Sequence, residues 1–592
     1  MKRYFFILIL VLIAIAGGDL RARGQTPTPT STPTPIPVQT FPDKQDVPPE
    51  NLKGVPAIAP DYRSNDRDLP DLGRVGVDIT QEKPLTLKDA IELALENNAD
   101  IEVARKTEAM AEFDLQSARG IYQTRLSGQT YYERSTVPNV SVFSSNQTTT
   151  QGTLLGNAGL QGYVPNFGTI LTSNFNNQSV TSNNSITILS PQFNSGLSFG
   201  VTQPLFRGRR FDVNRRTIEI AKRNIGLTDT QFRQRSIDVV AGVQRAYWDL
   251  TFALRNLQVQ RDGIRDAKSQ LEHNRRLVDE GQLAPIDVVA AETQVANFEQ
   301  AVYDALNTVN IAENVLKNLI TPNRNDAIWV QAITPVDSVE VAVPNSTLTE
   351  AMDLAIQNRP ELEINRVQKD INLLDQRLYR DQKKPQIDLI ASYTSAGIGG
   401  SQNSSFINPF ARTACINPQS PECLATIAQQ QAFLRNIGGS GTAFTDILQN
   451  KYPVFRVGVN FNLPLFGDKT AAAQLGKSKV EAARIDTQRE QIEQNIQVDV
   501  RNALQAVRSG EARLRSAAIA RENTTRQFES EQRKLDNGQS DVYKVLDRQT
   551  ALTVARSNEL RARTDLNKAI ADLQRATGNS LKANDVETKL KK

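Results

Sequence analysis

The chain has 592 residues, of which 69 are lysine or arginine and 65 are aspartate or glutamate, so its formal net charge is only +4. Such a small net charge gives no case for nucleic acid binding. One histidine and two cysteines leave little from which to build a metal centre. No nucleotide-binding loop and no catalytic constellation stands out, so we expect neither an enzyme nor a bound cofactor.

The first residues are typical of a secretory signal peptide. The sequence MKRYFFILILVLIAIAGGDLRARG opens with two basic residues, continues with an apolar run from Phe5 to about Ala16, and then turns to small residues. That run is shorter than the roughly 20 residues of a membrane-spanning helix, and no later stretch is apolar enough to span a bilayer as a helix. We therefore predict a signal peptide over residues 1–23 and an exported protein.

Residues 24–83 follow as a Pro-rich tether. The tract begins QTPTPTSTPTPIPVQTFPD at Gln25. A Pro/Thr sequence buries too little apolar surface to form a core and favours extended, polyproline-like conformations. We expect this segment to be disordered.

The rest of the chain carries three pairs of similar segments in the same order. TLKDAIELALENNADIEVAR pairs without a gap with TLTEAMDLAIQNRPELEINR, VTQPLFRG with FNLPLFGD, and GQLAPIDVVAAET with GQSDVYKVLDRQT. The paired segments lie about 260 residues apart, far beyond the roughly 20 to 50 residues of a stacked solenoid unit. We infer a whole-domain duplication, with repeats at 84–343 and 344–580 and a polar tail at 581–592.

Each repeat contains a very long predicted helix. Apolar residues recur every seventh position in both copies, which predicts a coiled-coil seam; they are Val243, Leu250, Leu257, Ile264, Leu271 and Val278, then Val500, Val507, Leu514, Phe528 and Leu535. A helix of about 65 residues reaches on the order of 100 Å. Each ends at a glycine, Gly281 or Gly538, because glycine readily takes the left-handed conformation that stops a helix. A second helix follows, so we predict two long helical hairpins.

Ahead of each long helix the apolar period changes to two. Alternating residues predict four strands, at about 124–133, 195–206, 385–394 and 454–466, each near the ten residues that a tilted strand needs to cross a bilayer. Pro204 and Pro464 mark the barrel-to-helix junctions, since proline cannot donate to a strand ladder. Long polar insertions occupy about 135–195 and 396–453, and residues 159–177 of the first are a candidate for a further hairpin.

Four strands cannot close a barrel, and a sheet in lipid must close to satisfy its edge hydrogen bonds. Two such chains would give eight strands around a core filled by side chains, whereas three would give twelve around a hollow one. Polar and glycine residues on the inner face favour a wet lumen. We therefore prefer three chains to two.

The two cysteines, Cys415 and Cys423, lie in the second insertion, which is rich in Asn, Ser, Pro and Gly. In an exported protein such a pair favours a disulfide over two free thiols or half of a metal site.

Over about residues 84 to 580 the chain resembles the TolC family of outer-membrane efflux and secretion proteins. The resemblance rests on the duplicated Thr-Leu-x-x-Ala helix starts, on TQPLFRGRR and NLPLFGD, and on a Gly-x5-Asp-Val motif at Gly281, Asp287 and Val288. It implies a mainly α-helical chain with a β-barrel portion, which as a homotrimer forms an α/β-barrel tunnel in the outer membrane that extends into the periplasm. It also implies a passive exit duct of a tripartite efflux or type I secretion system, docked to a periplasmic adaptor and an inner-membrane pump.

The same resemblance suggests functional residues at the hairpin ends. It implies a pore constriction at Asp547, Lys544 and Asp287, and adaptor docking around Gly281 and Gly538. A lysine ring near an aspartate ring should offset its attraction for cations. Asp287 also fits a plain helix cap, since it lies early in a new helix. The family's gate-locking tyrosine and arginine positions fall on a leucine, Leu535, and a serine, Ser540.

The alternative is an exported structural coiled-coil protein of the cell envelope without channel activity. The four alternating strands beside the helix starts argue against it. The cargo, whether drug, metal or protein, is not readable from these residues, because specificity belongs mainly to the pump.

Overall fold

The computed structural model describes residues 73–139, 147–339, 343–406, 419–435, 437–464 and 467–586, and these belong to one compact unit. The predicted signal peptide and residues 24–72 of the predicted tether lie outside the described residues. Among the described helices, none is both long enough and apolar enough to cross a membrane.

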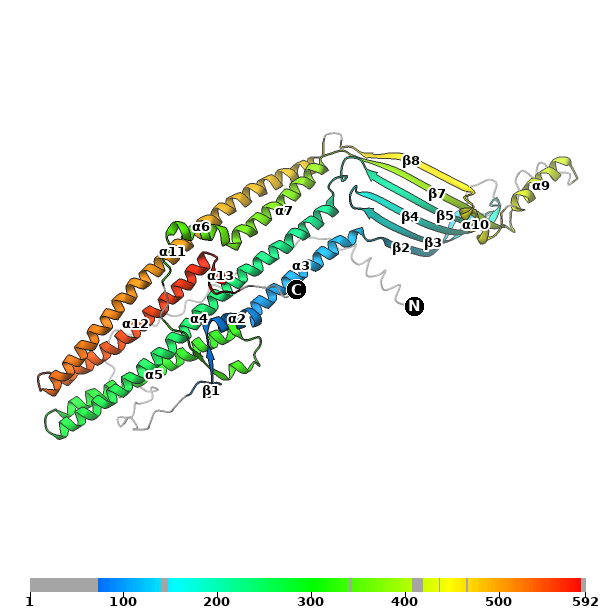
Figure 1. Ribbon diagram of the computed structural model, residues 1–592. Coiled ribbons are helices and arrows are strands. Elements are labelled where there is room, and N and C mark those ends of the chain that lie inside the picture. Colours follow the sequence, from blue (N-terminus) through cyan, green and yellow to red (C-terminus); the bar gives the residue numbers. More distant parts are fainter. Residues whose placement is uncertain are drawn as a thin grey trace, which may run out of the picture. The chain divides into compact units, whose positions relative to one another are not determined.

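The first repeat runs from strand to strand through two long helices (Figure 1). Its elements are β1 (Asp78–Leu85), α2 (Leu87–Asn97), α3 (Ala99–Arg119), the short η2 (Gly120–Tyr122), β2 (Arg125–Pro138), β3 (Thr148–Val164), β4 (Thr169–Ser182), β5 (Leu189–Pro204), α4 (Val213–Asp279), α5 (Pro285–Ile320), η3 (Ala327–Trp329) and β6 (Gln331–Pro335).

The second repeat has the same plan with fewer strands. Its elements are α6 (Leu348–Asn358), α7 (Pro360–Gln382), β7 (Gln386–Gln402), α9 (Pro421–Arg435), α10 (Ser440–Leu448), β8 (Tyr452–Asn462), α11 (Lys469–Asp536), α12 (Val542–Ala576) and α13 (Ser580–Ala583). The duplication seen in the sequence is therefore a duplication of structure.

The repeated Thr-Leu pair marks the first residues of matching helices. Thr86 accepts a hydrogen bond from the Asp89 backbone N–H at 3.1 Å, at the start of α2. Thr347 does the same for the Glu350 N–H at 3.3 Å, and the Glu350 carboxylate accepts a hydrogen bond from the Thr347 N–H at 3.0 Å. Both threonines are thus N-caps, which satisfy backbone donors that the first turn leaves free.

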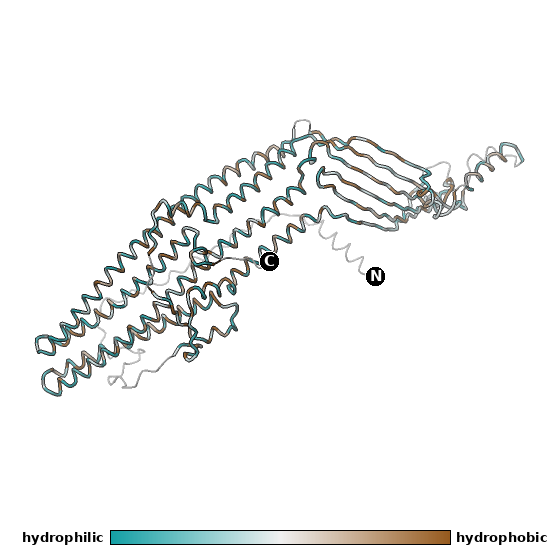
Figure 2. The backbone as a smooth tube through the Cα atoms, in the orientation of Figure 1, coloured by the Kyte–Doolittle hydropathy of each residue, from teal (hydrophilic) through white to brown (hydrophobic). Residues whose placement is uncertain are grey.

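The long helices pair as two hairpins, α4 with α5 and α11 with α12, and α12 also packs along α4. The helices α4 and α11 contain 67 and 68 residues, so each spans about 100 Å. Figure 2 shows apolar and polar residues alternating along them in short steps, as expected for helices with one buried stripe. Most of their buried apolar residues lie in two clusters, one per repeat, and two smaller clusters lie nearer the hairpin ends.

The last part of the range predicted as tether is structured. Residues 78–85 form strand β1, which pairs in parallel with β6 at the end of the first repeat. Leu85, at the end of β1, is buried in the first cluster. The tether prediction was therefore wrong for residues 78–83, because their pairing depends on a strand some 250 residues away in sequence.

The sheet has six strands rather than the predicted four. Its order is β2-β3-β4-β5-β7-β8, and every neighbouring pair is antiparallel. The additional pair, β3 and β4, fills the first predicted polar insertion and contains the hairpin suggested for 159–177. Small and amide residues dominate these strands, so their alternation is too weak to predict both from sequence.

The second predicted insertion also holds regular structure. Strand β7 runs on to Gln402, and helices α9 and α10 precede β8. Helix α10 packs on β7 where the strand carries Gly397 and Gly399; a Cβ on Gly397 would lie 1.8 Å from the Ala443 carbonyl oxygen. Ser395 adds a hydrogen bond to the Ile447 carbonyl oxygen at 2.8 Å.

Candidate functional site

The sheet has one apolar and one polar face. Residues that pair across neighbouring strands point to the same side, so each register row samples one face. One row consists of Leu126, Leu160, Ser173, Phe199, Tyr393 and Phe455. The adjacent row consists of Arg125, Gln161, Thr172, Gly200, Ser392 and Arg456.

The apolar face is largely exposed in the single chain. Its large side chains are half exposed or more on the edge strand β8, where Phe455 and Val457 are each 76% exposed and Phe461 is 67% exposed. A soluble monomer rarely leaves so continuous an apolar surface uncovered. With polar residues on the opposite face, this pattern matches a barrel wall with lipid outside and water inside.

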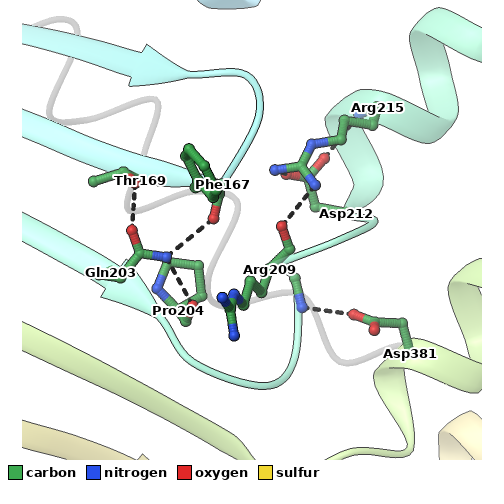
Figure 3. A network of polar contacts seen from close by, with 9 residues as sticks. Phe167, Thr169, Gln203, Pro204, Arg209, Asp212, Arg215 and Asp381 are labelled. Atoms are coloured by element: carbon green, nitrogen blue, oxygen red, sulfur yellow. Dashed lines mark hydrogen bonds and ion pairs between the residues drawn. The ribbon is translucent and has the colours of Figure 1, made fainter.

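The first barrel-to-helix junction is held by a network of polar contacts (Figure 3). Pro204 is the last residue of β5, and the Gln203 amide beside it donates to the Phe167 and Pro204 carbonyl oxygens at 3.1 and 2.9 Å. The Thr169 hydroxyl donates to Gln203 at 2.5 Å. Side-chain hydrogen bonds therefore hold the end of β5 at the point where its backbone pairing stops.

From Pro204 the chain turns into α4 at Gly208, whose φ is +80°. The Gly208 N–H donates to the Asp381 carboxylate of α7 at 2.6 Å. Asp212 caps α4 by accepting the Arg215 N–H at 2.8 Å, and Arg215 in turn donates to the Arg209 carbonyl oxygen at 2.8 Å.

The second junction repeats this arrangement in fewer residues. Pro464 follows the end of β8 by two positions, Gly467 has a φ of +77°, and Asp468 caps α11 by accepting the Ala471 N–H at 2.8 Å. The Arg207 guanidinium lies 3.7 Å from the Asp468 carboxylate and so connects the two junctions. The repeated Pro-Leu-Phe therefore precedes a left-handed glycine and an aspartate N-cap in both copies.

The two hairpin ends share one backbone turn. Gly281 and Gly538 have φ values of +72° and +70°. The N–H of the residue after each glycine bonds to a carbonyl oxygen five residues back, Gln282 to Leu277 and Gln539 to Lys534, both at 2.8 Å. This is a Schellman ending, which requires the left-handed conformation that glycine adopts without strain.

The helices that follow these turns are capped in opposite ways. In α5 the Asp287 carboxylate reaches back to the Ala284 N–H at 3.2 Å. In α12 Asp541 reaches forward to the Lys544 N–H at 2.9 Å. The geometry thus gives Asp287 the capping role that we expected as one of its two interpretations. Asp541 was missed, although an aspartate just before an apolar helix start is a usual N-cap signal.

Lys544 is paired within its own chain. Its ammonium lies 2.8 Å from the Asp541 carboxylate, and this contact raises the pKa of Lys544 and lowers that of Asp541. Asp547 lies one turn further along α12, 60% exposed at its side chain, with the Arg548 guanidinium 3.9 Å away. The end of the second hairpin therefore carries alternating charges at short range.

An apolar cluster joins the two hairpin ends. Leu535 is 5% exposed and packs with Val542, Val545 and Leu546 of its own hairpin and with Ala291 of the first. Ser540 donates to the Glu531 carboxylate at 2.5 Å, which lowers the pKa of Glu531. The two positions that match the family's gate-locking pair thus take part in packing and in a local hydrogen bond.

Polar side chains lie between the hairpins just above this cluster. Gln532 donates to Gln270 at 3.0 Å, and Gln270 donates to Asn274 at 2.8 Å. Gln549 is 3% exposed, and neither polar atom of its side chain has a hydrogen-bond partner among the described residues. His273 directly precedes Asn274 in α4, and its imidazole lies 3.4 Å from the Asp536 carboxylate of α11.

Two further site predictions concern metals and cysteines. In the part of the chain that the structure describes, no group of three or more His, Cys, Asp or Glu residues is placed to hold a metal ion. Cys423, at the start of α9, is buried and forms a disulfide. Its predicted partner, Cys415, lies outside the described residues, so the pairing itself stays a prediction.

Comparisons with known proteins agree with this geometry. The family model described as "Outer membrane efflux protein" matches residues 90–321 and 351–579, one match per repeat. The chain belongs to the outer membrane efflux protein family. Members of the outer membrane efflux protein family are efflux channels of the outer membrane. No curated protein matches the sequence.

Solved structures of outer-membrane channels share the fold at low identity. The outer-membrane channel OprN matches with a TM-score of 0.58 at 15% identity, covering 88% of this chain and 98% of its own. The CmeC outer membrane channel of Campylobacter jejuni matches at 0.56 and 14%, covering 85% and 90%. The MtrE outer membrane channel of Neisseria gonorrhoeae, in its open state, matches at 0.54 and 18%, covering 84% and 89%. The α/β-barrel tunnel fold of the outer membrane efflux protein family is therefore present here.

Proposed function

We propose that three copies of this chain form the passive exit duct of a tripartite efflux or type I secretion system. The sheet lies in the outer membrane, in contact with its lipid, and the long helices extend into the periplasm. The hairpin ends at Gly281 and Gly538 dock to a periplasmic adaptor, and an inner-membrane pump supplies the energy. Asp547, Lys544 and Asp287 border the pore at its narrow end.

One observation carries this proposal: a sheet with one continuous apolar face continues directly into helices of 67 and 68 residues. An open sheet cannot remain in lipid with unpaired edges, so copies must share one barrel. The same symmetry then gathers the long helices into a conduit of about 100 Å below the barrel. An envelope scaffold without a channel would need neither the apolar face nor the two-faced strands.

The proposed boundaries follow the duplication. The two repeats occupy 84–343 and 344–580, with β1 leading into the first, and a signal peptide at 1–23 and a tether that ends before β1 precede them. Residues 581–592 follow the second repeat, and they are not wholly a polar tail, because Leu581 is buried in the first apolar cluster. Each repeat then contributes one helical hairpin and one set of wall strands to the duct.

The test combines copy number with conduction. The protein extracted in detergent should give a mass of three chains by native mass spectrometry and should conduct ions in a planar lipid bilayer. A conducting monomer would contradict the shared barrel. A stable oligomer can also fail to conduct because its hairpin ends are closed, so the ends are held open by cross-links. If the oligomer still never conducts, the structural coiled-coil protein is favoured instead.

A further inference from the structure

The sheet has two strands more than the four that we predicted each chain to contribute to the barrel wall. Strands β2 and β8 form its edges, and in the described residues each pairs on one side only. Between them lie β3 and β4, which pair with each other at 14 positions, from Gln151 opposite Ser182 to Val164 opposite Thr169. The hairpin β3–β4 is therefore part of the sheet along nearly its full length.

The hairpin has the same two faces as the rest of the sheet. Leu154 and Leu160 of β3 and Leu171 of β4 lie in apolar rows and are 45 to 51% exposed. Their neighbours on the other face are uncharged and include Thr153, Gln161 and Thr172, of which Gln161 and Thr172 pair directly, although Leu155 and Ile170 also lie on that face. A loop that lay in water above the membrane would not need this alternation.

The strand ends also show the stagger of a tilted barrel. The register row through Arg125, the first residue of β2, reaches β8 at Arg456, six residues before β8 ends at Asn462. Six residues of about 3.4 Å, spread over five strand spacings of about 4.8 Å, correspond to a tilt of about 40°. Membrane barrels have tilts of about 35 to 45°, so all six strands fit one barrel wall.

We propose that β3–β4 enlarges the shared barrel, so that β8 of each copy pairs with β2 of the next and three copies close eighteen strands. The inference rests on the trimer of the proposed function. At the same tilt and spacing the barrel backbone is about 36 Å across, against about 24 Å for twelve strands. A lumen of this size corresponds to the porins, which enclose an aqueous channel.

The lining that the hairpin adds is neutral. The inward residues of β3 and β4 are mostly amides, hydroxyls and small residues, among them Asn157, Gln161, Thr172, Asn174 and Asn176. Such a wall binds water without favouring either sign of ion. The strands that β3–β4 adds therefore widen the lumen without adding charge to it, and the charged inner residues Arg125 and Arg456 lie on the edge strands.

Electron cryo-microscopy of the full-length protein in lipid nanodiscs tests the proposal directly. Three copies and eighteen strands are expected. Three copies around twelve strands, with β3–β4 outside the wall, would overturn the inference and leave the proposed duct intact. Two copies around twelve strands would overturn both. A variant lacking residues 147–187 should close twelve strands, because its β2 can then pair with β5.

Cysteine labelling provides a second test that does not depend on the deletion variant folding. A membrane-impermeant maleimide, applied without reductant to the channel in liposomes, should label Gln161→Cys and Thr172→Cys. It should not label Leu160→Cys or Leu171→Cys, which face lipid in the proposed wall. Equal labelling of both pairs would place the hairpin in water and refute the enlarged barrel.

The edge strand β8 supplies the matched control. Arg456→Cys should be labelled and Val457→Cys should not, because these residues lie on opposite faces of a strand that any shared barrel includes. If labelling alternates between the two faces of β8 but not of β3–β4, only the proposal of the enlarged barrel fails. If neither alternates, the sheet does not line a channel, and the proposed function fails as well.

Discussion

The two long helices have the same length and different surroundings. Helix α4 buries 21 of its 67 residues, whereas α11 buries only ten of 68. Helix α4 is in contact with α3, α5, α7 and α12, whereas α11 is in contact mainly with α12, α7 and α6. Apolar residues such as Val480, Val498 and Ile519 remain exposed on α11.

The difference shows which hairpin buries its apolar stripe within one chain and which does not. A helix of this length is stable only when a stripe of it is buried, because propensity alone does not hold it together. The first hairpin obtains that burial within the chain. The second does not, so its exposed stripe is the surface that neighbouring copies cover in the proposed trimer.

The largest effect is expected in the first hairpin, at the buried ion pair of α5. Lys317 and Glu313 are fully buried, 3.4 Å apart, and the Lys317 ammonium also donates to the Trp329 carbonyl oxygen at 3.0 Å. Lys317→Met removes the buried ammonium and leaves Glu313 with the Arg74 guanidinium, 3.3 Å away, as its ion-pair partner. It should cost about 3 kcal/mol of unfolding free energy, the lower end for a broken buried pair, because Arg74 still compensates part of the charge. Urea unfolding followed by tryptophan fluorescence measures it.

The matching position in the second hairpin is Gln574, which accepts a hydrogen bond from Gln244 at 3.2 Å. Gln574→Met should cost only about 1 kcal/mol, since a neutral hydrogen bond is lost. Adding Glu313→Gln to Lys317→Met should restore part of the stability. Equal losses at Lys317 and Gln574 would show that the two hairpins are held alike.

Tyr247 of α4 corresponds to Val507 of α11, and its hydroxyl donates to the Asp337 carboxylate at 2.6 Å. Tyr247→Phe should cost about 1 to 3 kcal/mol at neutral pH, because the hydrogen bonds that the hydroxyl of a fully buried side chain makes to Asp337 and Leu85 are lost. Burial raises the pKa of Tyr247 above its ordinary value of 10.0. Its stabilisation is therefore complete below about pH 10 and is lost as the pH rises further, since the unfolded phenol ionises first.

The gap between wild type and Tyr247→Phe should accordingly narrow above about pH 10. Denaturant midpoints across pH 7 to 11 measure it. A gap that stays constant would mean that the folded phenol has its ordinary pKa, and a gap that widens would mean that folding lowers this pKa; either result contradicts the prediction.

The hairpin turns should respond alike, since their backbones match. Gly281→Ala and Gly538→Ala each force a side chain into the left-handed region and should cost about 1 to 2 kcal/mol. Hydrogen exchange in the last turns of α4 and α11 reports the loss. Gly242→Ala, inside α4 with open space around it, should instead stabilise by about 0.5 to 1 kcal/mol. If only one of the two substitutions lowers the stability, the two turns are not equivalent and the prediction is wrong.

The smallest effect concerns the pore charge at the second hairpin end. Lys544→Asp removes the partner of Asp541 and adds a carboxylate near Asp547, so cation selectivity and block by divalent ions should increase. Asp547→Ala should decrease both. Reversal potentials under a salt gradient, with divalent ions on the periplasmic side, measure the change. Lys222→Asp, at the far end of α4, makes the same charge change and should leave selectivity unaltered.

The helical part of this fold was largely predictable because its signals are local. Thr86 and Thr347 cap helices within three residues, and Gly281 and Gly538 end them within five. The heptads of α4 and α11 repeat over many turns, so single exceptions do not hide them. The duplication reinforced each signal by showing it twice.

The missed elements depend on partners far away in the sequence. Strand β1 is stabilised by β6, and β3 and β4 by strands whose inward residues are small and polar. Helix α10 is placed by two glycines on β7 that allow its backbone to approach. Asp541 was overlooked although its signal was local. The roles of Asp547, Lys544 and Asp287 in a pore depend on neighbouring copies and stay predictions.

The contact between Arg207 and Asp468 has a mechanical consequence. It joins the start of α11 to the junction before α4, while Asp381 of α7 holds Gly208 and Lys369 of α7 pairs with Asp486 of α11 at 2.6 Å. These contacts therefore connect the two repeats to each other in the helical part next to the strands. A displacement at the far end of either hairpin would therefore be shared by both repeats before it reached the sheet.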